Sequence, residues 1–482
     1  MADIFRNFIN GSWVEGVSIN ADVNPSDTKD VVGEYSRGSK AQALDAIAAA
    51  KAAFANWSRS TPQERHEVLR KASDEILTRK VELGRLLARE EGKTLPEAIG
   101  EVTRAGQIFT FFAGEALRLT GDKVPSVRAN VDVEVTREGV GVIGIITPWN
   151  FPIAIPAWKI APALCYGNTV IFKPADLVPA CAWALVDILA RSGLPKGVLN
   201  LVMGRGSEVG EAILRSTDVD AITFTGSVAT GRKVAGAAID GPRLKKIQLE
   251  MGGKNPLVVL NDADLRVAVE CAVNGAFFST GQRCTASSRI IVESDIHDRF
   301  TTAMVDRMNQ LVVDDALKDG THIGPVVDQS QLDQNLRYLE IAKGEGAKLA
   351  FGGALLKRDI PGFYFQPALF TETTNAMRIS REEVFGPVAN IVRVKNYDEA
   401  LSVANDTEFG LCAGICTSSL KYASHFKRNS EAGMTMVNLP TAGVDYHVPF
   451  GGRKGSSYGA REQGSYAKEF YTHVKTSYTF AN

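Results

Sequence analysis

The middle of the chain alternates short apolar runs with longer amphipathic segments. Between Gly139 and Asp264 the apolar, β-branched runs are GVIGIITP, NTVIFKP, GVLNLVMG, DAITFTG and KIQLEMG. They recur at intervals of roughly 20 residues, which is typical of parallel strands separated by crossover helices. We therefore predict an α/β unit with a parallel sheet, and ligands of such sheets bind beyond the carboxyl ends of the strands.

A second alternation of the same kind follows Cys284. Its predicted strands are RIIVES, FQPALF, PVANIVRV and GMTMVN, with helices over residues 298–313 and around YDEALSVAND. Ahead of the first unit, Lys40 to Arg89 has apolar residues at helical spacing, and FINGSW is typical of a tight hairpin. The pattern thus predicts a helical front section followed by two α/β units.

Two predicted strands lie outside both α/β units. VDVEVTRE alternates polar and apolar residues, and the tail KEFYTHVKTSYTF is rich in aromatic and β-branched residues. Strands of this kind present backbone edges that another chain can pair with. We expect a homodimer or a homotetramer.

Composition narrows the classes of partner. The 482 residues include 54 Lys and Arg against 55 Asp and Glu, and 45% are hydrophobic. This balance gives no basis for a nucleic-acid partner, and no apolar run approaches the roughly 20 residues that span a membrane. Six irregularly spaced cysteines and a start without an apolar leader, MADIFRNFINGSW, indicate a reducing, cytoplasmic location.

Three common motifs are matched only in part. GRGSEVG places Val209 where a dinucleotide fingerprint needs glycine, and GSVATGRK has P-loop spacing without the Lys-Ser/Thr pair. GSSYG fits the hydrolase elbow, yet no strand precedes it and only His473 follows it. The six histidines show no ligand spacing, so we predict no metal site.

Cys284 has polar neighbours that set it apart from the other cysteines. It lies in FFSTGQRCTASSR, on a glycine-containing turn after an apolar segment, with Arg283 beside it. A neighbouring cation favours the reactive thiolate, so we expect Cys284 to be ionised readily. The other five cysteines lie in apolar segments and are interpreted as inert packing residues.

Seven motifs in fixed order resemble those of the aldehyde dehydrogenase superfamily, over essentially the whole chain. They are TPWNFP (147–152), KPAD (173–176), FTGS (224–227), LEMGGK (249–254), GQRC (281–284), EEVFGP (382–387) and PFGG (449–452). The resemblance implies an α/β fold with a Rossmann-type NAD(P)-binding domain, an α/β catalytic domain and a small β oligomerisation element. The implied ranges are 1–119 and 141–252, 253–440, and 120–140 with 460–482, respectively.

The resemblance also implies roles for individual residues. Cys284 would attack an aldehyde, because the resulting thiohemiacetal gives up hydride more readily than the aldehyde does. Asn150 and the Cys284 backbone N–H would hold the oxyanion, and Glu250 would be the general base that opens the thioester with water. NAD or NADP would be contacted by Trp149, Lys173, Asp176, Gly226, Ser227, Glu383 and Phe385.

Two of these positions bear on the cofactor in particular. Gly226 and Ser227 would open a helix whose N-terminus binds the pyrophosphate. Asp176 replaces the more common glutamate of the family, and its shorter side chain retreats from the ribose. We therefore predict that both NAD and NADP are used.

The substrate is indicated by a narrower similarity. GQRCTASSR and TAGVDYHVPFGGRKGSSYG are most similar to the group that oxidises α-ketoglutaric semialdehyde (2,5-dioxopentanoate), a small acidic aldehyde. Arg283 either pairs with the substrate carboxylate or points away into a local salt bridge, and backbone N–H groups of Thr441, Ala442 and Gly443 offer a second anion seat. Phe450 is a candidate wall residue. Succinic semialdehyde or a neutral aldehyde, a coenzyme A-acylating enzyme and a protein without turnover are the alternatives; retention of Cys284, Glu250 and Asn150 disfavours the last two.

Overall fold

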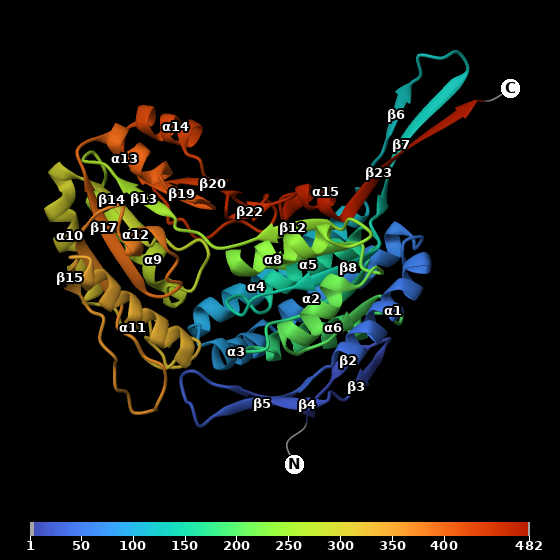
Figure 1. Ribbon diagram of the computed structural model, residues 1–482, viewed down its shortest axis with the longest axis horizontal. Coiled ribbons are helices and arrows are strands. Elements are labelled where there is room, and N and C mark those ends of the chain that lie inside the picture. The colour runs from blue at the N-terminus through green and yellow to red at the C-terminus, as the bar shows by residue number, and fades with distance from the viewer. Residues whose placement is uncertain (1–3, 481–482) are drawn as a thin grey trace.

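The computed structural model describes residues 4–480 and shows two α/β bodies side by side, with an arm of strands projecting from one of them (Figure 1). The first body contains an eight-stranded sheet in the order β22-β12-β11-β8-β9-β10-β2-β3, whose five central strands are parallel. Its strands are β2 (Asn7–Ile9), β3 (Ser12–Val14), β8 (Val142–Ile146), β9 (Thr169–Lys173), β10 (Leu199–Leu201), β11 (Ala221–Thr225), β12 (Lys246–Glu250) and β22 (Ser457–Tyr458).

The chain leaves the centre of this sheet in two directions. After β8 it runs through β9 and β10 on one side, and it then returns to build β11 and β12 on the other side of β8. The loops after β8 and β11 therefore diverge, which opens a crevice at the carboxyl ends of these strands. TPWNFP and FTGS form these two loops.

Helices cover both faces of the sheet. Helices α1, α7 and α8 bury one face in an apolar cluster, and α5 and α6, backed by α2, α3 and α4, bury the other. Ser39 and Gln42 form a capping box that fixes the start of α1. The helices are α1 (Lys40–Trp57), α2 (Pro62–Thr78), α3 (Lys80–Glu91), α4 (Leu95–Ala116), α5 (Ala154–Cys165), α6 (Ala180–Arg191), α7 (Glu211–Arg215) and α8 (Val228–Ile239).

The second body contains a seven-stranded sheet in the order β15-β16-β17-β14-β13-β19-β20, parallel except at β15. Its strands are β13 (Pro256–Val259), β14 (Arg289–Glu293), β15 (Lys348–Phe351), β16 (Ala368–Thr373), β17 (Val388–Val394), β19 (Cys412–Cys416) and β20 (Met434–Val437). Its helices are α9 (Leu265–Phe277), α10 (Ser294–Met308), α11 (Gln329–Gly344), α12 (Arg378–Arg381), α13 (Tyr397–Asn405) and α14 (Leu420–Asn429).

A chain segment after the second sheet returns to the first body. In this segment β21 (Arg453–Lys454) pairs with β18 (Phe409–Gly410), and β22 then pairs with β12. PFGG lies just before β21, so this motif is positioned between the two bodies.

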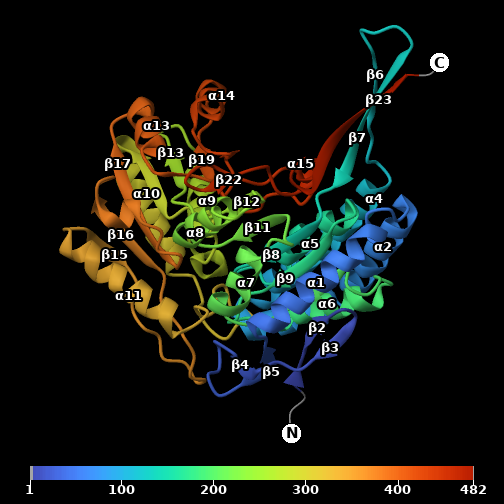
Figure 2. The ribbon, with the colours of Figure 1, turned by 45° about the vertical axis from the view of Figure 1, so that its right-hand side comes forward.

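The arm is a three-stranded antiparallel sheet in the order β23-β7-β6 (Figures 1 and 2). Its strands are β6 (Asp122–Pro125), β7 (Val131–Gly139) and β23 (Thr472–Phe480). Val474, Tyr478 and Phe480 on β23 are exposed although they are apolar. Exposed apolar side chains on a projecting sheet are typical of a surface that another chain covers.

The predicted α/β class, the hairpin, the front helices and the predicted strands are confirmed, but β13, β15 and β19 of the second sheet were not predicted. The helix predicted over residues 298–313 is α10, which begins at Ser294 and ends at Met308. One predicted strand is shorter than expected, because Lys468–Tyr471 of the tail forms helix α15 and β23 begins only at Thr472. The pattern also missed a sheet of β1 (Ile4–Phe5), β5 (Val31–Arg37) and β4 (Ser18–Val23). These three strands are stabilised by pairing with one another, and their sequences lack the local alternation that would have predicted them.

Candidate active site

Two cavities meet at the side chain of Cys284. One has a volume of about 290 Å³, and its lining includes Cys284, Asn150, Glu383 and the FTGS loop. The other has a volume of about 360 Å³ and is lined by residues of α4, α5 and the loop before PFGG, again with Cys284. One thiol is therefore accessible from two separate chambers, each large enough for part of a small ligand.

A strained turn presents Cys284. After α9 the backbone of Ser279 and Thr280 adopts left-handed angles, with φ of 51° and 55°. Such angles cost free energy in residues other than glycine, so they must be held by neighbours. Glu97 of α4 does so, because its carboxylate accepts hydrogen bonds from the Ser279 backbone N–H at 2.8 Å and the Ser279 hydroxyl at 3.1 Å.

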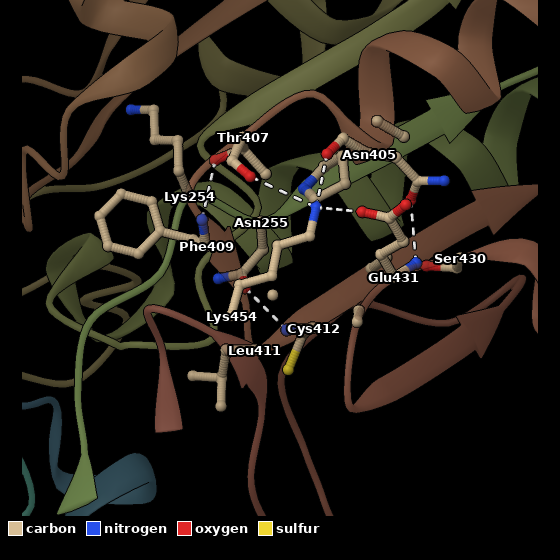
Figure 3. Close-up of a pocket in the computed structure, with 15 residues that line it drawn as sticks. Lys254, Asn255, Asn405, Thr407, Phe409, Leu411, Cys412, Ser430, Glu431 and Lys454 are labelled. Carbon is tan, nitrogen blue, oxygen red and sulfur yellow. Dashed lines mark hydrogen bonds and ion pairs between the residues drawn. The ribbon is translucent and has the colours of Figure 1, made fainter. Parts of the chain in front are cut away.

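Asn255 holds the other side of the Cys284 loop. Its Nδ2 donates to the carbonyls of Cys284 at 2.7 Å and Ala286 at 3.0 Å, and its Oδ1 accepts from the Cys412 backbone N–H at 2.9 Å. Figure 3 shows Asn255 beside Cys412, at a cavity of about 10 Å³ that is too small for a substrate. Asn255 thus connects the Cys284 loop to β19. LEMGGK ends one residue before it, so the motif did not single it out.

Asn150 reaches the same loop from the end of β8. Its Nδ2 donates to the carbonyl of Gln282 at 2.9 Å, two residues from Cys284. The Asn150 carbonyl accepts from buried Lys93 at 2.8 Å, and Lys93 is paired with Glu101 at 2.7 Å. The buried ion pair between Lys93, which follows α3, and Glu101 of α4 therefore holds the backbone of Asn150, while the side-chain amide is held by Gln282.

Glu250 is the last residue of β12 and is buried. Its carboxylate accepts a hydrogen bond from the Ser457 hydroxyl, and a Cβ added at Gly451 would lie 2.7 Å from its Oε1. PFGG therefore needs glycine at 451, where φ is also 146°. Burial, assisted by nearby Glu462, raises the pKa of Glu250 well above its usual value. Glu462 itself is paired with buried Lys159.

Glu383 lies across the smaller cavity from the end of β11. Its Oε1 accepts from the Gly253 backbone N–H at 2.9 Å, and a Cβ at Gly252 would lie 2.0 Å from its Oε2, so LEMGGK requires a glycine there. Burial raises the pKa of Glu383 to about 7. Phe385 and Trp149 meet edge to face, with ring centroids 5.4 Å apart, and both line this cavity.

The expected ionisation of Cys284 is wrong for the protein without ligands. Burial, followed by the nearby carboxylates of Glu383 and Glu250, raises the pKa of the Cys284 thiol to about 12. Arg283 does not outweigh these effects, because its guanidinium turns toward the carbonyls of Asn274 and Gly275. Its charge still interacts with Cys284, but burial and the two carboxylates dominate.

The predicted anion site at FTGS has the expected local structure. Ser227 is the N-cap of α8, its Oγ accepting from the Thr230 backbone N–H at 3.3 Å. Lys173 lies outside the smaller cavity, and its Nζ donates to the Pro174 carbonyl at 2.8 Å. Burial lowers the pKa of Lys173 to about 8.

Asp176 is paired with a residue that the sequence did not indicate. Arg37 of β5 donates to its carboxylate through Nε, at 3.0 and 3.1 Å, and through Nη2, at 2.5 Å. Both residues line a third cavity, of about 540 Å³, separate from the two at Cys284. The sequence pattern gave no indication of Arg37, because β5 belongs to the sheet that the pattern did not predict.

The larger cavity carries two arginines. Arg283 lines it, as does Arg104 of α4, whose Nη2 donates to Gln463 at 3.1 Å. Among residues 4–480, the buried Nε atoms of both arginines have no hydrogen-bond partner. Arg104 lies over the ring of Trp158, 5.6 Å from its centroid, and Trp158 stacks on Phe450. Arg104 was not predicted, since nothing in its helical segment distinguishes it from a surface residue.

Of the three residues predicted to form an anion site in the loop before PFGG, two line the larger cavity. Ala442 and Gly443 line the larger cavity together with Phe450. Thr441 does not, because it is fully buried and its hydroxyl donates to the Thr285 carbonyl at 2.6 Å. Thr441 therefore stabilises the Cys284 loop through Thr285, and its predicted place in the lining of the cavity is wrong.

Residues 4–480 contain neither a helix that could cross a membrane nor a cluster of metal-binding side chains. No helix in this range is both long enough and apolar enough to cross a membrane. Within the same range, no group of three or more His, Cys, Asp and Glu side chains is arranged to hold a metal ion.

The raised pKa of Cys284 predicts a steep pH dependence of alkylation. Between pH 7 and pH 10 the thiolate fraction, and with it the rate of reaction with iodoacetamide, should rise about tenfold per pH unit without a plateau. Glu383→Gln removes a carboxylate that disfavours the thiolate, so it should accelerate the reaction roughly threefold to tenfold between pH 8 and pH 10, where Glu383 is ionised. Peptide mass spectrometry of Cys284 measures both rates, and a plateau below pH 9 would contradict the assignment.

The bridging role of Asn255 predicts that Asn255→Asp loosens the Cys284 loop. A carboxylate would face the carbonyls of Cys284 and Ala286 without a donor, which should cost about 1–3 kcal/mol and lower the melting temperature by about 2–4 °C. The alkylation rate of Cys284 should change at the same time. The matched control, Asn309→Asp at an exposed position, should alter neither the melting curve nor the rate.

Comparison with known proteins identifies relatives along nearly the whole chain. Residues 13–477 match the Aldehyde dehydrogenase family. The chain is 44% identical to α-ketoglutaric semialdehyde dehydrogenase of Bacillus subtilis, covering 98% of this chain and 97% of the relative. It is 42% identical to α-ketoglutarate semialdehyde dehydrogenase of Haloferax volcanii, covering 99% of each.

Solved structures give the same result for the fold. Betaine aldehyde dehydrogenase from Staphylococcus aureus in complex with NAD⁺ superposes with a TM-score of 0.96 at 34% identity, over 99% of this chain and 95% of that one. The match extends across both α/β bodies and the arm. On its sequence and its fold alike, the chain belongs to the aldehyde dehydrogenase family.

Proposed function

We propose that the protein oxidises an acidic semialdehyde, α-ketoglutaric semialdehyde, to the carboxylate with NAD as electron acceptor. The observation that carries the proposal is the position of Cys284 between two cavities, which allows one sulfur to contact substrate from one side and cofactor from the other. The relatives from Bacillus subtilis and Haloferax volcanii are named for this activity.

The first step is addition of the Cys284 sulfur to the aldehyde carbon. The thiol first releases its proton to water, and the thiolate then forms the C–S bond while the carbonyl π electrons move to the oxygen as an alkoxide. The Asn150 amide, held near Gln282, and the Cys284 backbone N–H are the donors that hold this alkoxide. An oxyanion donor of this kind lowers the barrier by ~3 kcal/mol.

The smaller cavity fits the nicotinamide end of the cofactor. The N-terminus of α8 offers backbone N–H groups and the Ser227 hydroxyl to the pyrophosphate, and Glu383 offers its carboxylate to the ribose. Trp149 and Phe385 enclose the cavity. When bound, NAD supplies the acceptor for the hydride of the thiohemiacetal, and its cationic ring favours the Cys284 thiolate. Lys173 and Asp176 are assigned to the adenosine ribose.

The second step opens the thioester with water. Glu250 takes a proton from this water as the water oxygen bonds to the acyl carbon. The C–S bond then breaks, the carboxylic acid leaves, and Glu250 returns the proton to the sulfur to restore the thiol. Its raised pKa suits the role, because a base with a pKa closer to the working pH accepts protons more effectively than an ordinary carboxylate. The base is ionised only above that pKa, so hydrolysis accelerates as the pH rises.

The substrate's distal carboxylate is assigned to the larger cavity. Arg104 and Arg283 each carry a buried Nε that has no hydrogen-bond partner among residues 4–480, and buried cations are costly unless an anion compensates them. Ala442 and Gly443 add the opposite wall, and Phe450 and Trp158 enclose the carbon chain. The charged lining residues are three cations, Lys93, Arg104 and Arg283, and two carboxylates, Glu97 and Glu101. Glu101 is paired with Lys93 and Glu97 is engaged by Ser279, so the two arginines leave a positive charge that favours an acidic semialdehyde over a neutral aldehyde.

The oligomeric state and the cellular location are proposed from the strands of the arm and from the cysteines. The apolar side chains of β23 and the open edges of the arm support a homodimer or a homotetramer. The six cysteines are all free thiols, which supports a reducing, cytoplasmic location.

Glu250→Gln is expected to separate the two steps. The variant should form about one equivalent of NADH rapidly, since addition and oxidation do not need the base. Steady-state turnover should then fall at least about 100-fold, within the range for loss of a general base. Stopped-flow absorbance at 340 nm measures both phases, and unchanged steady-state turnover would exclude Glu250 as the base.

Arg104→Ala is expected to affect acidic substrates selectively. It should raise KM for 2,5-dioxopentanoate about 10–100-fold, because a buried charge-assisted contact is lost, and should change KM for pentanal less than threefold. Arg283→Ala should act in the same direction, and exposed Arg85→Ala is the matched control. Equal effects of Arg104→Ala on both aldehydes would remove Arg104 from the carboxylate site.

A further inference from the structure

The ion pair between Arg37 and Asp176 is unusual in how firmly it is held. Arg37 forms three hydrogen bonds with the Asp176 carboxylate, through Nε and Nη2. Asn20 of β4 accepts from Arg37 Nη2 at 2.6 Å and donates to the Asp176 backbone carbonyl at 2.6 Å. Two strands of the N-terminal sheet thus fix a carboxylate that follows β9.

The pair changes the charge at the proposed adenosine ribose. A free carboxylate at position 176 would repel a 2′-phosphate, whereas a bidentate guanidinium neutralises it at short range. The side chains of Arg37 and Asp176 are 23% and 27% exposed, so the pair lies at the surface of the site and a ligand can reach it. Within residues 4–480, Arg37 Nη1 has no protein partner and remains available to an anion.

Space for an anion lies beside the pair. The cavity of about 540 Å³ is lined by Arg37 and Asp176 and also by polar Gln329 and Ser330 at the start of α11. Its other charged lining residue is Asp328, whose carboxylate is engaged as the N-cap of α11 by the Gln331 backbone N–H at 2.8 Å. Arg37 is therefore the cationic group that this cavity presents.

We propose that Arg37 forms a subsite for the 2′-phosphate of NADP, so that the ribose site accepts NADP as well as NAD. Arg37 keeps Asp176 neutralised through Nε and Nη2 and donates Nη1 to the phosphate. Arginine suits this double task because its planar guanidinium presents donors along two edges. The proposal rests on the cofactor site proposed above and adds to it a residue that discriminates between the two dinucleotides.

Binding of NAD⁺ and NADP⁺ by isothermal titration calorimetry, without aldehyde, tests the subsite. The wild-type protein should bind both with dissociation constants within about tenfold of each other. Arg37→Ala should weaken NADP⁺ at least about 30-fold, because it removes the phosphate donor and exposes the Asp176 carboxylate, and should weaken NAD⁺ less than threefold. Arg6→Ala, which removes a nearby exposed arginine paired with Glu15, should change neither.

Two further variants make the test independent of folding and of the cofactor site. Arg37→Lys keeps the charge but not the forked donors, so NADP⁺ affinity should fall between wild type and Arg37→Ala. Adding Asp176→Ala to Arg37→Ala should recover NADP⁺ affinity at least about fivefold. Equal loss of both dinucleotides in Arg37→Ala and Arg37→Lys, or wild-type binding of NAD⁺ alone, would overturn the subsite. Failure of wild type to bind either dinucleotide would overturn the cofactor site itself, and the subsite with it.

Discussion

The hydrogen bonds of Asn255 are the interaction on which the site depends. They join the carbonyls of Cys284 and Ala286 to the backbone of Cys412 across two segments of the second body. Together with the Glu97 contact to the strained turn, they leave the sulfur little freedom to move. Because Cys284 must face two cavities at once, a small displacement would remove it from one of them.

Burial of ionisable groups is the second constraint. Burial raises the pKa of Cys284, Glu250 and Glu383, which interact with one another, so the site carries less negative charge than three ordinary groups would. This arrangement keeps the thiol protonated until ligands change its surroundings. It also gives Glu250 the basicity that hydrolysis requires. Burying these ionisable groups costs free energy of folding, and the shifted pKa values that result serve the chemistry of the site.

The fold was largely predictable because buried strands and crossover helices impose periodicities that a single sequence carries. The family motifs indicated Cys284, Glu250, Asn150 and Glu383, and for Glu250 and Asn150 the position at the end of a predicted strand gave a second reason. Arg37, Arg104 and Asn255 could not be found in this way, since their partners lie far away in sequence and the contacts arise only on folding. The charge state of Cys284 was mistaken for a related reason: adjacency to Arg283 along the chain does not fix where a side chain points.

The central claim is that the acyl group passes through the sulfur of Cys284. Peptide mass spectrometry of Glu250→Gln enzyme, quenched with acid after mixing with NAD⁺ and 2,5-dioxopentanoate, tests it most directly. We expect one acyl group per chain, on the peptide containing Cys284 and removable by hydroxylamine. An adduct on another residue, or undiminished aldehyde oxidation by Cys284→Ser, would contradict it.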